Sequence, residues 1–526
     1  MRQGTSYRSP LAWRGVLAVA FLAGWATLVV ELTAGRLLGQ HFGVTNIVWA
    51  TVIGLILVYL SAGYTWGGRL ADARPDPGVL GWALVVAGAA LMVVPMVARP
   101  LLRWADAAFA SWAVGVLAAA FVAVLLLFAL PITLLGMVSP YLIRLALRDA
   151  TIAGQVSGRI YAASTWGSVL GSFSAVLVLI PWVGTARTFV LAGLVAGGLG
   201  VLLLPRGRTR GLTAVVLLGL AAGVWFWGAR GPIKARAGLL YETESAYNYI
   251  QVVETPDGWR WLLLNEGQGV QSVYHPQHLA LGGTWVHFHA APFLWPAMTP
   301  DQVRRVAIVG LAGGTAARQA AAFFPGVQVD GWEVDPAVVE VGRRFFGLDA
   351  IPGLRVWVDD GRRGLRNTAA RYDLIILDAY RPPYIPPHLT TVEFFDLVRQ
   401  RLAPRGAVAL NVVRTPDDRR LVDAFVATLR QVFPTVYGMD VPGSWNTLLY
   451  ATAEPVPAPQ HALAANAEAL AQADAHPWLV QAVRHAAAYP APRPGPGLVF
   501  TDDRAPVDWL TDAIAVRYLL APKPSP

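Results

Sequence analysis

The 526-residue chain contains no cysteine, and lysine occurs only at positions 234 and 523. The absence of cysteine excludes disulfide bonds, thiol catalysis and zinc sites built from thiolates. Charged residues are also scarce, at 14% against 55% hydrophobic residues, and they are concentrated after residue 230. The two halves of the chain are therefore predicted to lie in different solvents. The second half lacks a stripe of basic residues interleaved with aromatics, so we expect no nucleic-acid partner.

Long apolar segments fill the first half of the chain. About 20 apolar residues are needed for a helix to cross the core of a bilayer. Segments of this kind lie near residues 13–35, 46–67, 79–98, 111–134, 162–182, 186–204 and 211–228. The first is too long for a cleaved signal peptide and carries Glu31 and Arg36. The fourth continues past Pro131 and is also compatible with a re-entrant piece. We predict a multi-pass helical membrane domain over residues 1–232, with about seven helices and the lipid bilayer as its partner.

A glycine-rich turn marks the second half. Residues 306–309 form a short apolar run typical of a buried parallel strand, and Gly310, Gly313 and Gly314 follow it. A helix that begins at such a turn offers free N–H groups to a bound nucleoside. The next apolar run ends at Glu333, roughly 20 residues further on, where an acid can accept hydrogen bonds from ribose hydroxyls. This pattern predicts an α/β Rossmann-like domain over residues 301–526, although glycines at such a turn can also serve packing alone.

Four segments in this order, GLAGGT, WEVDP, DDGRRGL and YDLIILDAY, resemble the spermidine synthase family. The resemblance covers about residues 239 to 450. Its upstream part, YETESAYNYIQVVE and LLLNEGQGVQSVYHP, is similar to the small β-rich subdomain that precedes the Rossmann domain in that family, here residues 239–300. The first half resembles the membrane part of bacterial proteins in which such a domain is fused to several membrane helices. The resemblance implies a fold of the class I methyltransferase type and transfer of an aminopropyl group from decarboxylated S-adenosylmethionine (AdoMet) to an amine.

The same resemblance implies roles for individual residues. Asp378, in YDLIILDAY, matches the acid that holds and deprotonates the amine, although an Asp at a strand end can also cap the next turn. The expected cofactor-binding residues are Gly310, Gly313, Gly314, Glu333 at the ribose, Asp360 at the adenine amino group, and Asn248 in place of a cofactor-facing Gln. The expected substrate-side residues are Gln271, Tyr274, Tyr380 and Arg381.

Two departures from the family concern the acceptor. DAYRP places Arg381 where polyamine-making members carry a second acid, and QSVYHP lacks the carboxylates of their acidic stretch. A guanidinium within about 5 Å repels a cationic amine by several kcal/mol even at an effective dielectric near 20. Putrescine is therefore predicted to be a poor acceptor. Methyl transfer from AdoMet to a membrane-associated acceptor, and a non-catalytic scaffold or transporter-like role, remain alternatives.

Histidines cluster at residues 275–289, but no acid or histidine recurs with a metal-ligand geometry, and we expect no metal. Arginines in the loops of the first half fall mainly on the side of the N-terminus, which predicts a plasma-membrane protein with a cytoplasmic N-terminus. Seven spans would then place the soluble domain outside the cell, whereas AdoMet-type cofactors are cytoplasmic metabolites. The side of the soluble domain and the oligomeric state therefore stay open.

Overall fold

The computed structural model describes residues 12–42, 46–109, 115–147, 149–228, 233–265, 269–280, 282–380 and 385–520. The chain divides into two compact units, Met1–Ala235 and Arg236–Pro526. Each unit has a hydrophobic core of its own.

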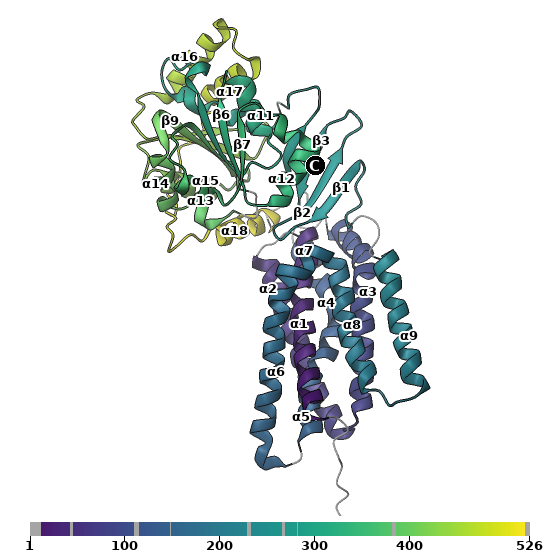
Figure 1. Cartoon of the computed structure of the whole chain (residues 1–526). Helices are drawn as coiled ribbons and strands as arrows, with labels where there is room; N and C mark the ends of the chain where they lie inside the picture. Colours follow the sequence, from purple (N-terminus) through teal and green to yellow (C-terminus); the bar gives the residue numbers. More distant parts are fainter. Residues whose placement is uncertain are drawn as a thin grey trace, which may run out of the picture. The chain divides into compact units, whose positions relative to one another are not determined.

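The N-terminal unit is entirely helical where it is described (Figure 1). Its helices are α1 (Trp13–Phe42), α2 (Asn46–Ala73), α3 (Pro77–Phe109), α4 (Gly115–Gly136), α5 (Val138–Ala146), α6 (Ala153–Ser174), α7 (Ile180–Val183), α8 (Thr185–Leu203) and α9 (Arg208–Gly223), with the short 3-10 helix η1 (Ala150–Ile152) and the short π-helices η2 (Ala175–Leu179) and η3 (Val224–Gly228). Seven segments of the described chain are long and apolar enough to cross a membrane. The prediction of about seven such helices is confirmed.

Helices α4 and α5 form the fourth apolar segment, Phe121–Ala146. Pro131 lies inside α4. Only Met137 separates the two helices, and its backbone is itself helical, with φ −66° and ψ −19°. The segment that the sequence also allowed to be re-entrant therefore runs on from α4 into α5 with a single local break.

Small residues bring helices α1 and α6 into close contact. A Cβ atom on Gly167 of α6 would lie 1.8 Å from the carbonyl oxygen of Phe21 in α1. Such contacts let two helix backbones approach closely, which is how helices associate where no water drives them together. The indole of Trp25 also donates to the hydroxyl of Ser174 at 2.9 Å. The outer face of α6 exposes apolar side chains, among them Trp166 and Phe173.

The C-terminal unit contains two sheets. The first is antiparallel, with strand order β1-β2-β3-β4: β1 (Leu239–Glu244), β2 (Tyr249–Glu254), β3 (Arg260–Leu264) and β4 (Val270–Tyr274). The second has the order β10-β11-β9-β8-β5-β6-β7: β5 (Arg305–Val309), β6 (Gln328–Glu333), β7 (Leu354–Val358), β8 (Tyr372–Leu377), β9 (Leu402–Val413), β10 (Thr435–Asp440) and β11 (Asn446–Thr452). Strands β5 to β9 are parallel, and β11 runs antiparallel to both neighbours.

Helices cover both faces of the seven-stranded sheet (Figure 1). Alternate residues of β5 explain this arrangement, because Val306 and Ile308 join one core while Ala307 and Val309 join the other. The helices are α10 (Trp285–Phe288), α11 (Thr315–Phe323), α12 (Pro336–Phe346), α13 (Gly361–Asn367), α14 (Val392–Gln400), α15 (Arg420–Leu429), α16 (Pro459–Gln472), α17 (Pro477–Ala488) and α18 (Val507–Leu520), with η4 (Ala291–Leu294), η5 (Pro300–Gln302), η6 (Leu348–Ala350) and η7 (Pro387–Leu389). The Rossmann-like fold predicted from the glycine turn is confirmed.

The contact between α1 and α6 makes a prediction about stability. We expect Gly167→Leu to lower the apparent melting temperature of the detergent-solubilised chain, because overpacking a close contact costs about 1–3 kcal/mol or more. Gly158→Leu, in the same helix, is the matched control, since a Cβ there meets no described atom within 4 Å. Equal melting temperatures for the two variants, measured by intrinsic fluorescence, would contradict the packing.

Candidate active site

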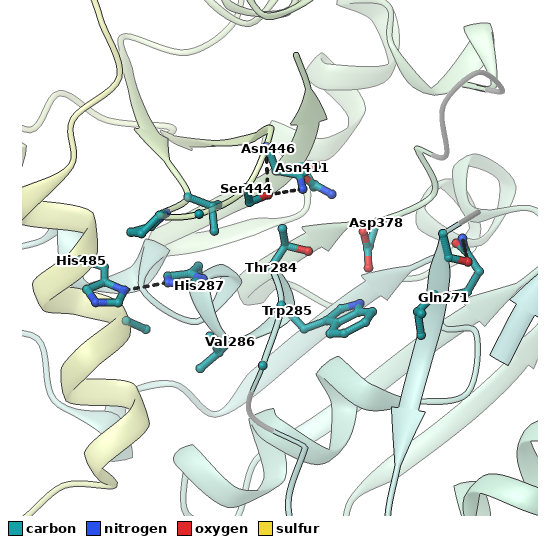
Figure 2. A pocket seen from close by; sticks show the side chains of 18 of the residues that line it. Gln271, Thr284, Trp285, Val286, His287, Asp378, Asn411, Ser444, Asn446 and His485 are labelled. Atoms are coloured by element: carbon teal, nitrogen blue, oxygen red, sulfur yellow. Dashed lines mark hydrogen bonds between the residues drawn. The ribbon is translucent and has the colours of Figure 1, made fainter. Parts of the chain in front are cut away.

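A cavity of about 580 Å³ lies at the carboxyl ends of strands β5 and β8 (Figure 2). In the sheet, β5 pairs with β6 on one side and with β8 on the other, so the chain order reverses at this point. Ligands of open α/β sheets bind in the crevice at such a reversal. The cavity is lined by β4, by the segment that leads into α10, by the turn after β5, and by parts of β9, α17 and the β10–β11 turn.

The turn after β5 is fixed by backbone contacts. Gly310 has a φ of +89°, and a Cβ there would lie 2.7 Å from the carbonyl oxygen of Asp378. No residue with a side chain could take this conformation and this position together. The N–H of Ala312 donates to Oε2 of Glu333 at 3.0 Å, while Oε1 accepts the N–H of Asp335 at 3.1 Å. Glu333 thus ties the glycine turn to the end of β6.

Burial governs the charge of Glu333. Removal from water raises the pKa of its carboxyl to about 7, and the two backbone hydrogen bonds only partly oppose this shift. A carboxylate offers about four lone-pair sites, of which these bonds use two. The remaining sites can accept hydrogen bonds from a pair of vicinal hydroxyls.

The two further glycines of the turn connect it to the small sheet. The N–H of Gly313 donates to the hydroxyl of Ser272 in β4 at 2.8 Å. Gly314 is left-handed, with φ +83°, and precedes the first residue of α11. That residue, Thr315, exchanges hydrogen bonds of 2.9 and 3.0 Å with the backbone of Val273. These bonds hold β4 against the turn and place Gln271 on the cavity wall.

Asp378 follows β8 and faces the cavity (Figure 2). Its N–H donates to the carbonyl oxygen of Val309 at 2.9 Å, which fixes it beside the glycine turn. Burial raises the pKa of its carboxyl to about 7, partly offset by a hydrogen bond from the side chain of Trp285. A carboxyl with a pKa near neutrality is matched to accepting a proton during a reaction.

Two of the predicted cofactor residues belong to neighbouring networks. Asp360 caps α13 by accepting the N–H of Arg363 at 2.9 Å, and it contacts Nε2 of His388 at 2.8 Å, which lowers the pKa of its carboxyl. Asn248 donates to Asp335 at 2.8 Å. The backbone N–H of Asp335 in turn donates to Glu333, so Asn248 is linked to Glu333 through one intermediate residue. Of the predicted cofactor-binding residues, only Gly310 is among the described residues that line the cavity; Gly313, Gly314, Glu333, Asp360 and Asn248 are not.

The predicted substrate-side residues separate in the structure. Tyr380 lines the cavity, but its hydroxyl donates to the carbonyl oxygen of Leu389 at 2.6 Å, and burial raises its pKa. Tyr274 packs under the guanidinium of Arg318, 4.9 Å from the ring centre. Arg381 lies outside the described residues, so its effect on the acceptor stays a prediction.

Several residues of the cavity wall lie outside the sequence motifs. Asn411 interrupts the apolar run of β9, so the sequence carried a signal for it, as it did for His287 in the histidine cluster. The hydroxyl of Ser444 accepts a hydrogen bond of 2.6 Å from the side-chain amide of Asn446. His287 and His485 meet at 3.1 Å between Nε2 and Nδ1. Burial lowers the pKa of His287 to about 4, so its ring is neutral at pH 7.

Residues 293–442 match the family model of the spermine/spermidine synthase domain. A polyamine aminopropyltransferase of Vibrio vulnificus is 31% identical over 243 residues, which are 45% of this chain and 78% of that protein. The protein of Bifidobacterium longum named "Probable polyamine aminopropyl transferase" is 33% identical over 217 residues, 40% of this chain, and this chain spans about half of its length, 47%. The human eEF1A lysine and N-terminal methyltransferase is 31% identical over 160 residues, 28% of this chain and 23% of that protein.

The buried carboxyl of Asp378 makes stability depend on pH. It ionises at a pKa of about 3.9 in an unfolded chain and at about 7 in the folded protein. The stability contributed by the protonated form is therefore complete below about pH 4 and is lost as the pH rises through 7. Because Asp378→Asn removes this loss, we expect the melting temperature of the variant, relative to wild type, to be higher at pH 8 than at pH 4.5. A pH-independent difference would show that Asp378 is not desolvated. Glu333 is common to both proteins and cancels in the comparison.

Proposed function

Because the chain belongs to the spermidine synthase family, we propose that its C-terminal unit transfers an aminopropyl group from decarboxylated AdoMet to an amine. The observation that carries this proposal is the position of Asp378. Its buried carboxyl faces the same cavity as Gly310 and Ala312 of the turn that Glu333 holds in place. A proton acceptor and a nucleoside-binding turn are thus available to two substrates in one site.

The arrangement supports a direct displacement. The nitrogen lone pair of the amine attacks the carbon next to the sulfonium, a C–N bond forms, and the C–S bond breaks with its electron pair left on sulfur. Methylthioadenosine leaves, and the proton released by the amine passes to the carboxylate of Asp378. Burial favours this step, because a carboxylate in a poorly solvated site gains more from accepting a proton than one in water.

The turn and Glu333 fit an adenosine-containing substrate. Gly310 leaves no room for a side chain between the turn and Asp378, so the backbone itself forms the wall. The lone pairs of Glu333 that are not engaged by Ala312 and Asp335 suit the two ribose hydroxyls. Asp360 begins the next helix and is proposed to face the adenine side of the same substrate.

Methyl transfer from AdoMet is the second candidate. It is favoured by the similarity to the human eEF1A lysine and N-terminal methyltransferase, which extends over 160 residues. The nucleoside site and the proton acceptor would be the same in both reactions, and only the transferred carbon would differ. The mass added to the acceptor, three carbons with an amine or one carbon, distinguishes the two reactions.

We further propose that the N-terminal unit lies in the plasma membrane and that the acceptor is a small-molecule amine or a membrane-associated amine. The seven long apolar segments support this placement. So do the exposed Trp166 and Phe173 on α6, which lipid would cover. Membrane fractionation of cells that express the chain tests it, and recovery in the soluble fraction would refute it.

Binding of methylthioadenosine to the detergent-solubilised chain tests the role of Glu333. We expect Glu333→Gln to weaken binding by about 1.5–3 kcal/mol, the scale for hydrogen bonds to a charged acceptor. Glu340→Gln, at an exposed position of α12, is the matched control and should bind as wild type does. Calorimetric titration measures both. An unchanged dissociation constant for Glu333→Gln would place the ribose elsewhere.

Turnover tests the role of Asp378. We expect Asp378→Asn to reduce release of methylthioadenosine, with a panel of primary amines as acceptors, by roughly 10²–10⁴, the usual range for a positioned acid–base group. Binding of methylthioadenosine should change little, because other residues hold the nucleoside. Turnover at the wild-type rate, with the variant folded and binding, would leave Asp378 without a catalytic role.

A further inference from the structure

The charge of the cavity wall is unevenly distributed. Among the described lining residues, Asp378 is the only acid, and no lysine or arginine is present. The rest of the polar lining consists of amides, hydroxyls and imidazoles, represented by Gln271, Thr284, Asn411 and Ser444 (Figure 2). The one carboxylate is already needed at the reacting amine. Among the described residues, the wall beyond the nucleophilic nitrogen of an acceptor is therefore neutral and polar.

We propose that Asn411, Ser444 and Asn446 form a subsite for a neutral hydrogen-bonding group of the acceptor, such as a hydroxyl or an amide, instead of a second ammonium. The proposal rests on the proposed function, because it assigns the far end of the amine substrate. It makes the acceptor an amino alcohol or an amino amide and assigns specificity to these three side chains.

The hydrogen bonds of the subsite point to a donor on the ligand. Oδ1 of Asn411 is buried and has no hydrogen-bond partner among the described residues. A buried carbonyl oxygen without a donor is rare, and a ligand group that supplies an O–H or N–H satisfies it. Asn446 uses its amide nitrogen on Ser444 at 2.6 Å, and its backbone N–H also donates to that hydroxyl at 3.1 Å. Ser444 is thereby held in place, with its own proton left to donate.

The neutral lining also discriminates against a diamine. An ammonium removed from water needs a carboxylate partner, whereas a hydroxyl needs only hydrogen bonds. A diamine would bring two ammonium groups to a described wall with a single carboxylate. An amino alcohol of the same length places a hydroxyl against Asn411 and leaves Asp378 to the reacting nitrogen. The choice is therefore made by desolvation of the distal group and not by the size of the cavity.

Pairs of acceptors that differ only at the distal group test this subsite. The full chain in lipid nanodiscs is given decarboxylated AdoMet with amino alcohols of three to five carbons and with the diamines of equal length. We expect kcat/KM to favour the amino alcohol by roughly 10- to 100-fold in the best-fitting pair. Asn411→Asp, which adds a carboxylate with little change of shape, should shift this ratio towards the diamine by at least about tenfold. Asn446→Asp is the second variant if Asn411→Asp does not fold. Asn367→Asp, an exposed amide outside this cavity, is the matched control and should keep the wild-type ratio.

The outcomes separate the subsite from the proposed reaction. A wild-type preference for the diamine in every pair, or a ratio unmoved by both aspartate variants, overturns the subsite while aminopropyl transfer stands. The second arm replaces decarboxylated AdoMet with AdoMet. Methylated products with the same preference for amino alcohols, and no aminopropylated ones, overturn the proposed transfer and support the subsite. Calorimetry on the complex with methylthioadenosine adds a reading without turnover, in which tighter binding of the diamine overturns the subsite.

Discussion

The close approach of strands β5 and β8 at their carboxyl ends sets the geometry of the C-terminal unit. The N–H of Asp378 binds the carbonyl oxygen of Val309 at 2.9 Å, and Gly310 lies so near that a Cβ would be 2.7 Å from the carbonyl oxygen of Asp378. This contact places the carboxyl of Asp378 beside the glycine turn. The turn is fixed in its own right by Glu333 and by Ser272 of the small sheet. The glycine turn and the carboxyl of Asp378 are therefore parts of one edge of the sheet.

Burial gives that edge its chemistry. Asp378 and Glu333 both have pKa values raised to about 7 because the surrounding apolar cores exclude water. On the described cavity wall beside Asp378, His287 is held uncharged by the same desolvation. The described wall of the cavity therefore carries one carboxyl group and no lysine or arginine.

The N-terminal unit is governed by a different constraint. Its helices have few charges with which to recognise one another, and they approach through backbone contacts such as that of Gly167 with Phe21. Large apolar side chains are left on outer faces, as Trp166 and Phe173 show. In the C-terminal unit, Phe394 and Phe395 are fully buried.

The sequence by itself determined the number of long apolar helices, because each is a long apolar run. It also determined the glycine turn and the acids at the ends of β6 and β8, because these stand at the ends of short apolar strands and at a fixed distance from the turn. It could not determine where side chains point. Asn248 is directed to Asp335, and Asp360 caps α13. Only the tertiary structure brought Trp285, Asn411, Ser444 and His485 into the wall of the same cavity as Asp378. These residues come from loops, strands and helices far apart in the chain. The sequence around a single polar residue does not indicate which distant residues it will contact, because those contacts depend on the order of the strands in the sheet.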